Sequence, residues 1–167
     1  IHLHTVGDAP YTDPKYKDSF KVTNLFVGAN MRGRMNYENI DYLPCFLSEI
    51  PMLFRSGKRP LDVALLHVSP PDQHGFCTLG VSVDVAKAAV DSAKIIIAQV
   101  NKQMPRVHGD GVIHISKIHH FIEVDEAIPE SPIANLTEVD KAIGKFAAQI
   151  IQDGSTLQVG IGSVPDA

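Results

Sequence analysis

Short apolar runs alternate along this chain with segments whose apolar residues recur at helical spacing. The clearest run, 95–100, is uncharged and rich in β-branched residues, as expected of a strand buried on both faces. The run 63–68 is another buried-strand candidate, and the shorter runs 25–27 and 157–159 also predict strands. Residues 1–6 favour a strand as well.

Between the strands, three segments predict helices. A helix is predicted over residues 49–55, and the hydroxyl of Ser48 can cap its start. Pro51 lies in its first turn, where proline is tolerated. Gly57 then provides a stop. Residues 83–93 are rich in alanine and lead almost directly into the next strand.

The strongest helix prediction is 138–152. Thr137 can cap this helix, Asp140 lies in a position like that of a capping box, and Gly154 can end it. The apolar stripe of this helix is formed by Val139, Ile143, Phe146 and Ile150.

The alternation of strands and helices predicts an α/β fold with a mostly parallel sheet and helices on both faces. Such sheets bind ligands beyond the carboxyl ends of their strands, so we expect function in the loops after 63–68, 95–100 and 157–159. The stretch 127–135 contains prolines and is expected to be an extended surface connector.

Composition is that of an ordinary globular domain, with 167 residues of which 44% are hydrophobic and 20% charged. The net charge is −4 and Lys and Arg form no cluster, which argues against nucleic acid as a partner. No apolar run reaches the length of about 18 residues that a spanning helix needs, so we expect no membrane span.

Cys45 and Cys77 lie far apart and form no CxxC motif, so neither a disulfide framework nor a cysteine zinc site is expected. We therefore predict a reducing compartment, the cytoplasm, or the mitochondrion for a eukaryotic protein. The eight histidines lack the spacing of a metal site such as HExxH, so no metal is predicted. A cysteine hydrolase built on Cys77 and His74 is disfavoured, because the spacing supplies no third catalytic group.

The loop 69–82 combines prolines, which stiffen the chain, with glycines, which allow close approach to a ligand. Pro71 and His74 are therefore candidate ligand-binding residues. The alternative, from composition alone, is a rigid structural loop in which Asp72 caps a turn.

The loop that follows the strand at 95–100 is a second candidate. Asn101 and Gln103 could read amides or hydroxyls, and Lys102 or Arg106 could meet a phosphate. A solvated loop with exposed cations is the alternative interpretation.

The strongest local feature is 156–167, where a predicted strand enters a Gly-x-Gly turn and a Ser and a Pro can open a helix. Backbone N–H groups there could hold a phosphate, or the oxygen of a thioester as it gains negative charge. A plain strand-to-helix turn is the alternative, since neither the dinucleotide fingerprint nor a P-loop lysine is complete. The candidate residues of this turn are Gln158, Gly160, Ile161, Gly162, Ser163 and Pro165.

Taken together and in this order, the segments 68–77, 98–106, 113–118 and 157–167 resemble the acetyl-CoA hydrolase/transferase family. The resemblance covers nearly the whole chain and implies a two-domain α/β enzyme with its active site between the domains. It implies a glutamate nucleophile that attacks an acyl-CoA thioester, after which an acyl-glutamyl anhydride and then a glutamyl-CoA thioester form. Coenzyme A is then a substrate, and no permanently bound cofactor is expected.

The resemblance also assigns Gly160 and Gly162 to an oxyanion hole formed by backbone N–H groups. It places the nucleophilic glutamate a little beyond the Pro-Asp-Ala segment that ends at Ala167, and Glu49 and Glu123 do not match its context; neither does Glu130. We therefore expect residues 1–167 to be an incomplete N-terminal CoA-transferase domain, inactive alone, that works with a C-terminal domain and small carboxylate substrates in a homodimer or larger oligomer.

Three other functions stay open on the residues alone. One is a thioester hydrolase, in which water takes the place of the carboxylate acceptor. Another is a non-catalytic α/β module that binds a nucleotide or phosphate. A sugar-phosphate isomerase is the third, because ribose-5-phosphate isomerases share a related fold.

Overall fold

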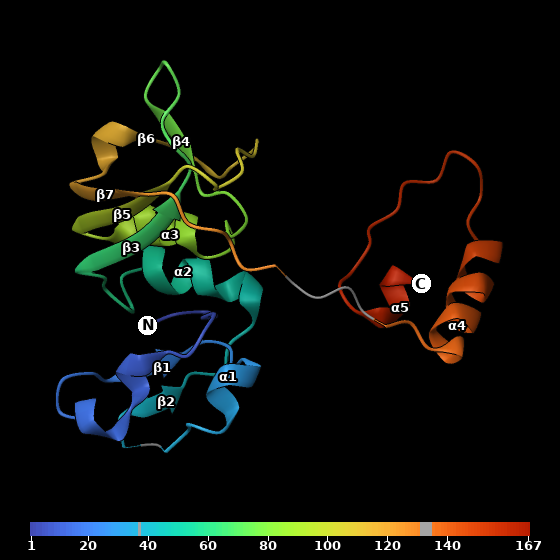
Figure 1. Cartoon of the computed structure of the whole chain (residues 1–167), viewed down its shortest axis with the longest axis horizontal. Helices are drawn as coiled ribbons and strands as arrows, with labels where there is room; N and C mark the ends of the chain where they lie inside the picture. Colours follow the sequence, from blue (N-terminus) through green and yellow to red (C-terminus); the bar gives the residue numbers. More distant parts are fainter. Residues whose placement is uncertain (37, 131–134) are drawn as a thin grey trace. The chain divides into compact units, whose positions relative to one another are not determined.

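The computed structural model describes residues 1–36, 38–130 and 135–167 (Figure 1). The chain forms two compact units, Ile1–Ile128 and Pro129–Ala167. Their boundary falls within the predicted connector 127–135, of which residues 131–134 lie outside the described residues.

The centre of the first unit is a 3-stranded sheet in the order β3-β5-β7 (Figure 1). Strands β3 (Val63–Val68) and β5 (Ile95–Asn101) are parallel, and β7 (His120–Val124) is parallel to β5. This confirms the strands predicted at 63–68 and 95–100 and the parallel sheet, but the expected burial on both faces was wrong, because alternate residues of each strand are exposed or half-buried. Strand β7 was not predicted, because its side chains are largely exposed and do not alternate between apolar and polar residues.

One face of this sheet forms the main core. Alternate residues of β3 and β5 point into it, and Val90 of helix α3 (Ala86–Ser92) packs against them. Leu65, on the opposite face, is 78% exposed, so helices cover the sheet on one face within this unit. The buried residues contributed by β3 and β5 are Ala64, Leu66, Val68, Ile96, Ala98 and Val100.

Two small strand pairs accompany the sheet. The antiparallel pair β4 (Phe76–Thr78) and β6 (Val112–His114) places Cys77 opposite Ile113 in the main core. The parallel pair β1 (Val22–Asn24) and β2 (Ile40–Tyr42) lies in the N-terminal part of the unit.

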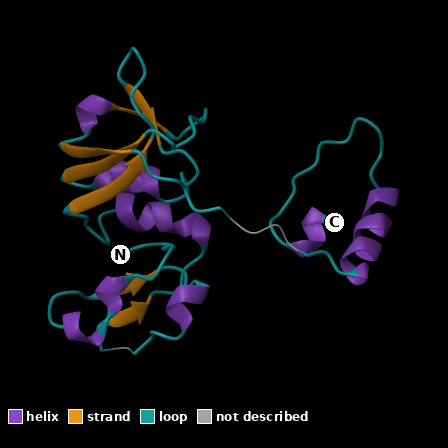
Figure 2. Cartoon of the chain, viewed as in Figure 1, coloured by secondary structure: helices purple, strands orange, loops and turns teal. Residues whose placement is uncertain are grey.

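Three strand predictions were wrong. The strand expected at 25–27 lies earlier, at Val22–Asn24, because those residues pair with β2 while Leu25 packs beside the helices. Of residues 1–6, only His2 makes a bridge, to Asn24. Residues 157–159 form no strand, since a strand needs a paired neighbour and the described part of their unit contains helices and loops (Figure 2).

Helix α2 (Ile50–Arg55) follows a short 3-10 helix η3 (Leu47–Glu49), so Ser48 lies inside that turn and does not cap α2. Pro51 does occupy the first turn of α2, as predicted. Helix α3 is shorter than the predicted 83–93 and packs against α2. The remaining short elements of the first unit are η1 (Pro10–Thr12), η2 (Pro14–Tyr16), α1 (Ala29–Arg32) and η4 (Ile115–Lys117).

The second unit contains α4 (Glu138–Gln149) and α5 (Ser163–Asp166). The predicted capping box is present: the Thr137 hydroxyl accepts from Asp140 N at 3.1 Å, and Asp140 Oδ2 accepts from Thr137 N at 2.9 Å. The helix ends earlier than the predicted 152. Its apolar stripe is exposed within the unit.

Candidate functional site

The carboxyl ends of β3, β5 and β7 meet at one edge of the sheet, because the three strands are parallel. Four predicted site residues follow these strands: Pro71 and His74 after β3, and Asn101 and Gln103 at and after the end of β5. The structure therefore gathers these four in one region of the first unit, here called the carboxyl edge.

Asn101 holds the ends of β5 and β7 together. Its side chain is fully buried, and its amide nitrogen donates to the Glu126 carbonyl at 2.7 Å. Its amide oxygen accepts from the backbone N–H groups of Glu126, at 3.1 Å, and Gln103, at 3.0 Å. These bonds fix the backbone at Gln103 and Glu126, and the buried Asn101 side chain itself offers no exposed group to a ligand.

Gln103 is exposed beside Asn101. Its amide nitrogen donates to Asp125 Oδ1 at 2.8 Å, and Gln99 makes a similar bond to Glu126 Oε2 at 3.3 Å. Gln103 is therefore the side chain of this loop that can meet a ligand while its backbone is fixed from below by Asn101.

Asp72 organises the loop after β3 by capping its tight turn. Its Oδ1 accepts from the backbone N–H groups of His74, at 2.9 Å, and Phe76, at 2.8 Å. The N–H of Phe76, the N–H of His74 and the nearby Arg106 guanidinium hold the pKa of Asp72 below its ordinary value. The alternative interpretation of this loop as a turn capped by Asp72 is thus confirmed, with His74 exposed at its tip.

Arg106 reaches from the loop after β5 to the loop after β3. Its Nη2 donates to Asp72 Oδ2 at 2.6 Å, and its Nη1 donates to the Phe76 carbonyl at 3.0 Å. The phosphate role considered for Arg106 is therefore not the one that its geometry favours, because Asp72 already neutralises the guanidinium.

His114, on β6, supports the same turn from its other side. The backbone N–H of Ser116 donates to His114 Nδ1 at 3.2 Å, so the neutral ring carries its proton on Nε2. That Nε2–H donates to the His74 carbonyl at 3.1 Å. The ring also meets Phe76 edge-on, with centroids 5.0 Å apart.

Cys77 follows this turn but is 0% exposed, and burial raises the pKa of its thiol. A buried, neutral thiol is a poor nucleophile. The geometry thus agrees with the inference that Cys77 and His74 do not form a cysteine hydrolase.

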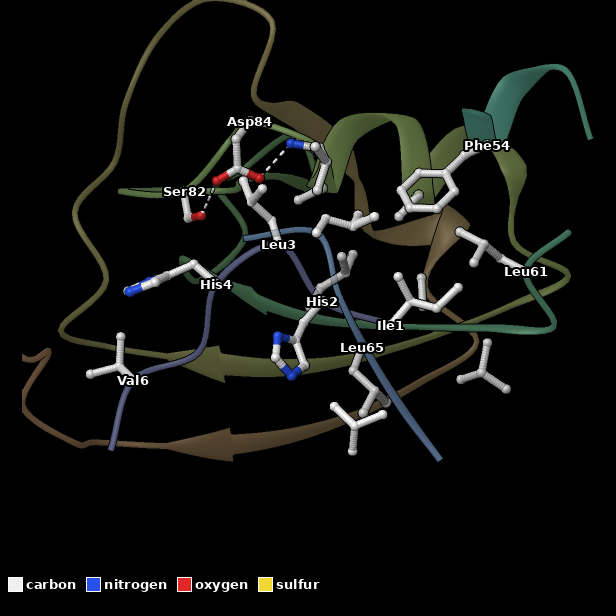
Figure 3. A pocket seen from close by; sticks show the side chains of 18 of the residues that line it. Ile1, His2, Leu3, His4, Val6, Phe54, Leu61, Leu65, Ser82 and Asp84 are labelled. Carbon is white, nitrogen blue, oxygen red and sulfur yellow. Dashed lines mark hydrogen bonds between the residues drawn. The ribbon is translucent and has the colours of Figure 1, made fainter. Parts of the chain in front are cut away.

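A cavity lies elsewhere in the first unit (Figure 3). Its volume is about 920 Å³, and Ile1, Leu3 and Leu65 are among its mostly apolar lining residues. None of the predicted site residues lines it. Its polar groups include Ser82 and Asp84, whose side chains bond to each other at 2.5 Å.

The other predicted site residues lie in the second unit. Gly162 has φ +127° and precedes α5, while Ile161 is 100% exposed. The Ser163 hydroxyl donates to Asp140 Oδ1 at 2.9 Å, which ties the glycine turn to the start of α4. Hydrogen bonds from the Thr137 hydroxyl, the Thr137 N–H and Ser163 hold the pKa of Asp140 below its ordinary value. Gln158 and Pro165 flank this turn and are exposed.

Comparison with known proteins shows which family the chain belongs to. The family model described as the acetyl-CoA hydrolase/transferase N-terminal domain matches residues 2–134. The chain belongs to the acetyl-CoA hydrolase/transferase family.

Relatives within this family are similar along the whole chain. A 4-hydroxybutyrate coenzyme A transferase of Clostridium kluyveri is 45% identical over 167 residues, which are 100% of this chain and 39% of the relative. A succinyl-CoA:acetate/propanoyl-CoA:succinate CoA transferase of Fasciola hepatica is 45% identical over 168 residues, covering 100% of this chain and 35% of the relative. The chain thus spans less than half the length of these relatives.

Solved structures agree with the family and the fold. A 4-hydroxybutyrate CoA-transferase from Porphyromonas gingivalis has 38% identity and a TM-score of 0.73, covering 98% of this chain and 44% of that chain. RipA from Yersinia pestis has 29% identity and a TM-score of 0.82, covering 90% of this chain and 37% of that one. The predicted α/β fold of a CoA-transferase N-terminal domain is thereby confirmed.

Sequence reasoning missed three members of the carboxyl edge of this family domain. Asp125 and Glu126 follow strand β7, which was not predicted, so their position beside Gln103 and Asn101 could not be predicted either. His114 lies in one of the segments that resemble the family, yet its contact with His74 joins residues that are 40 positions apart. A prediction of β7 would have signalled the first two.

Two further features are missing from the described part of the chain. No three His, Cys, Asp or Glu side chains gather there in a group that could hold a metal ion. No helix there is long and apolar enough to cross a membrane.

Proposed function

We propose that this chain is part of an enzyme that transfers CoA between an acyl-CoA thioester and a small carboxylate through a glutamyl-CoA intermediate. The observation that carries the proposal is the 45% identity over the full chain to a 4-hydroxybutyrate coenzyme A transferase. The second relative at the same identity is also a CoA transferase, with different acids in its name. We therefore propose the reaction class and leave the acid unassigned.

In this reaction a glutamate carboxylate attacks the thioester carbonyl, and the CoA thiolate leaves as an acyl-glutamyl anhydride forms. The thiolate then attacks the glutamyl carbonyl, which releases the acyl group as a carboxylate and leaves glutamyl-CoA. The acceptor carboxylate reverses these steps and departs as the new acyl-CoA. Covalent catalysis of this kind divides one difficult exchange into easier ones.

We place the nucleophilic glutamate outside residues 1–167. At the carboxyl edge the Glu126 carboxylate already accepts a hydrogen bond from Gln99 at 3.3 Å. The isolated segment 1–167 is accordingly expected to be inactive. Detectable turnover by that segment alone would contradict this placement.

The residues of this chain would bind and orient the substrate. In the first unit we propose that Pro71, His74 and Gln103 contact CoA at the carboxyl edge, with Asn101 fixing the backbone of Gln103. In the second unit we propose that the N–H groups of Gly160 and Gly162 stabilise the oxyanion. Their neighbours Gln158, Ile161, Ser163 and Pro165 would contact the thioester end.

A hydrolase is the second candidate, and the family description that includes acetyl-CoA hydrolases favours it. The two activities differ in whether water reaches the acyl-enzyme. Both would use the remainder of the longer polypeptide, and we propose a cytoplasmic homodimer or larger oligomer. The free thiols Cys45 and Cys77 fit a reducing compartment.

A panel of acyl-CoA donors and carboxylate acceptors tests the proposal on the full-length protein. The transferase predicts a new acyl-CoA whose formation depends on the added acid, with little free CoA. Free CoA released at the same rate without any acid would favour the hydrolase. Neither product from any donor would refute both.

A further inference from the structure

The side chain of Arg106 joins the two loops at the carboxyl edge, a contact that the sequence patterns of the loops did not predict. Arg106 spans 34 residues of sequence to bind Asp72, and with its other nitrogen it binds the Phe76 carbonyl. Asp72 in turn uses its second oxygen to cap the N–H groups of His74 and Phe76. One carboxylate thus shapes the turn, and one guanidinium ties that turn to the neighbouring loop.

We propose that Arg106 and Asp72 are positioning residues that hold His74 in place for the binding of acyl-CoA. The inference rests on the proposed function and adds residues that the family resemblance did not assign. Neither residue touches the reacting atoms. Their effect passes through the backbone of the turn that carries His74.

The geometry separates this pair from an ordinary surface ion pair. The side chains of Arg106 and Asp72 are 40% and 29% exposed, and both also bond to backbone groups. Lys94 and Asp62 form a pair at a similar distance, 2.7 Å, but are 74% and 80% exposed. Exposed single pairs contribute little, whereas a guanidinium with two fixed acceptors orients what it binds.

A second contact keeps the same turn in place. The His114 ring donates from Nε2 to the His74 carbonyl, and it comes so close to Gly75 that a β-carbon there would lie 2.7 Å from Nε2. The turn is therefore held from one side by Arg106 and from the other by His114. When a loop is already ordered before the ligand binds, less of the binding free energy is lost in ordering it.

The test compares Arg106→Gln with Lys94→Gln in the full-length protein. Lys94 lies just before β5, at the opposite end of the strand from Asn101, so its variant removes a similar ion pair away from the carboxyl edge. For Arg106→Gln we expect KM for acyl-CoA to rise on the order of tenfold, with kcat changed less than about twofold. Lys94→Gln should keep both constants.

Arg106→Lys provides the graded variant. Lysine keeps the charge beside Asp72 but lacks the fork that reaches two acceptors, so an intermediate KM is expected. If Arg106→Gln does not fold, Arg106→Lys decides alone: a raised KM supports the inference and an unchanged one overturns it. A KM for Arg106→Gln equal to that of Lys94→Gln also overturns it, as does a fall in kcat without a rise in KM.

Amide hydrogen exchange tests the positioning role of Arg106 without depending on CoA transfer. In Arg106→Gln the N–H groups of His74 and Phe76 should exchange faster than in the parent, while Lys94→Gln leaves them unchanged. If the parent protein transfers no CoA, the proposed function fails. If exchange at His74 and Phe76 is unaltered in Arg106→Gln, the positioning role fails, whatever the activity.

Discussion

Gly75 and His114 approach so closely that a β-carbon at position 75 would lie 2.7 Å from His114 Nε2. Gly75 also has φ +82°, in the left-handed region that side chains disfavour. The close approach is what lets His114 donate to the His74 carbonyl. The turn at the carboxyl edge therefore depends on the absence of a side chain at this position.

Gly75→Ala should lower the free energy of unfolding by about 2–4 kcal/mol, because backbone strain adds to a steric clash with His114. Gly57→Ala is the matched control, since Gly57 has φ +73° but a β-carbon there would meet nothing within 4 Å. The control should lose about 1 kcal/mol from backbone strain alone. Urea unfolding measures both, and equal losses would contradict the close contact.

Asn101→Ala should destabilise the protein by about 1–3 kcal/mol, because it removes a fully buried side chain that makes three hydrogen bonds to the backbone of Glu126 and Gln103. Gln103→Ala, at an exposed position, should change stability by less than about 0.5 kcal/mol. The proposed function predicts the opposite order for binding, with Gln103→Ala raising KM for acyl-CoA. An Asn101→Ala protein as stable as the parent would refute the structural role of Asn101.

The acid stability of the protein should depend on Asp72. Its pKa is lower in the folded state, so its contribution to stability is present above the unfolded value of about 3.9 and is lost as pH falls through the folded value. The stability difference between the parent and Asp72→Asn should therefore be largest near neutral pH and shrink below about pH 4. Denaturant unfolding at several pH values measures it. A difference that grows in acid would contradict this assignment.

Alkylation should distinguish the two cysteines. Cys77 is fully buried with a raised thiol pKa, whereas Cys45 is half-buried. Iodoacetamide at neutral pH should therefore modify Cys45 at least about tenfold faster, as peptide mass spectrometry can show. Cys77→Ala should retain CoA transfer in the full-length protein. Loss of turnover by a folded Cys77→Ala variant would revive the cysteine nucleophile.

The features that were predicted correctly are those with a clear signal in a short stretch of sequence. The Thr137–Asp140 capping box was visible in the sequence because its residues are close together in the chain, and β3 and β5 were visible as apolar runs. The prediction of a strand at 157–159 was wrong, because a strand also needs a paired neighbouring strand, which an apolar pattern alone does not indicate.

The candidate site was predictable in location but not in its internal contacts. Parallel strands put Pro71, His74, Asn101 and Gln103 at one edge, as the sequence indicated. The roles within that edge depend on pairs far apart in sequence, above all Asp72 with Arg106. Such pairs follow from the tertiary fold, so composition left Asp72 as a possible cap and Arg106 as a possible phosphate ligand.

Trapping the covalent intermediate tests the central proposal most directly. The full-length protein is incubated with acyl-CoA, reduced with borohydride, digested and searched for a modified glutamate. CoA transfer through glutamyl-CoA predicts that one glutamate outside residues 1–167 is reduced, only when acyl-CoA is present, with matching loss of activity. No acyl-CoA-dependent modification, or modification of Glu49, Glu123 or Glu130 instead, would contradict the account.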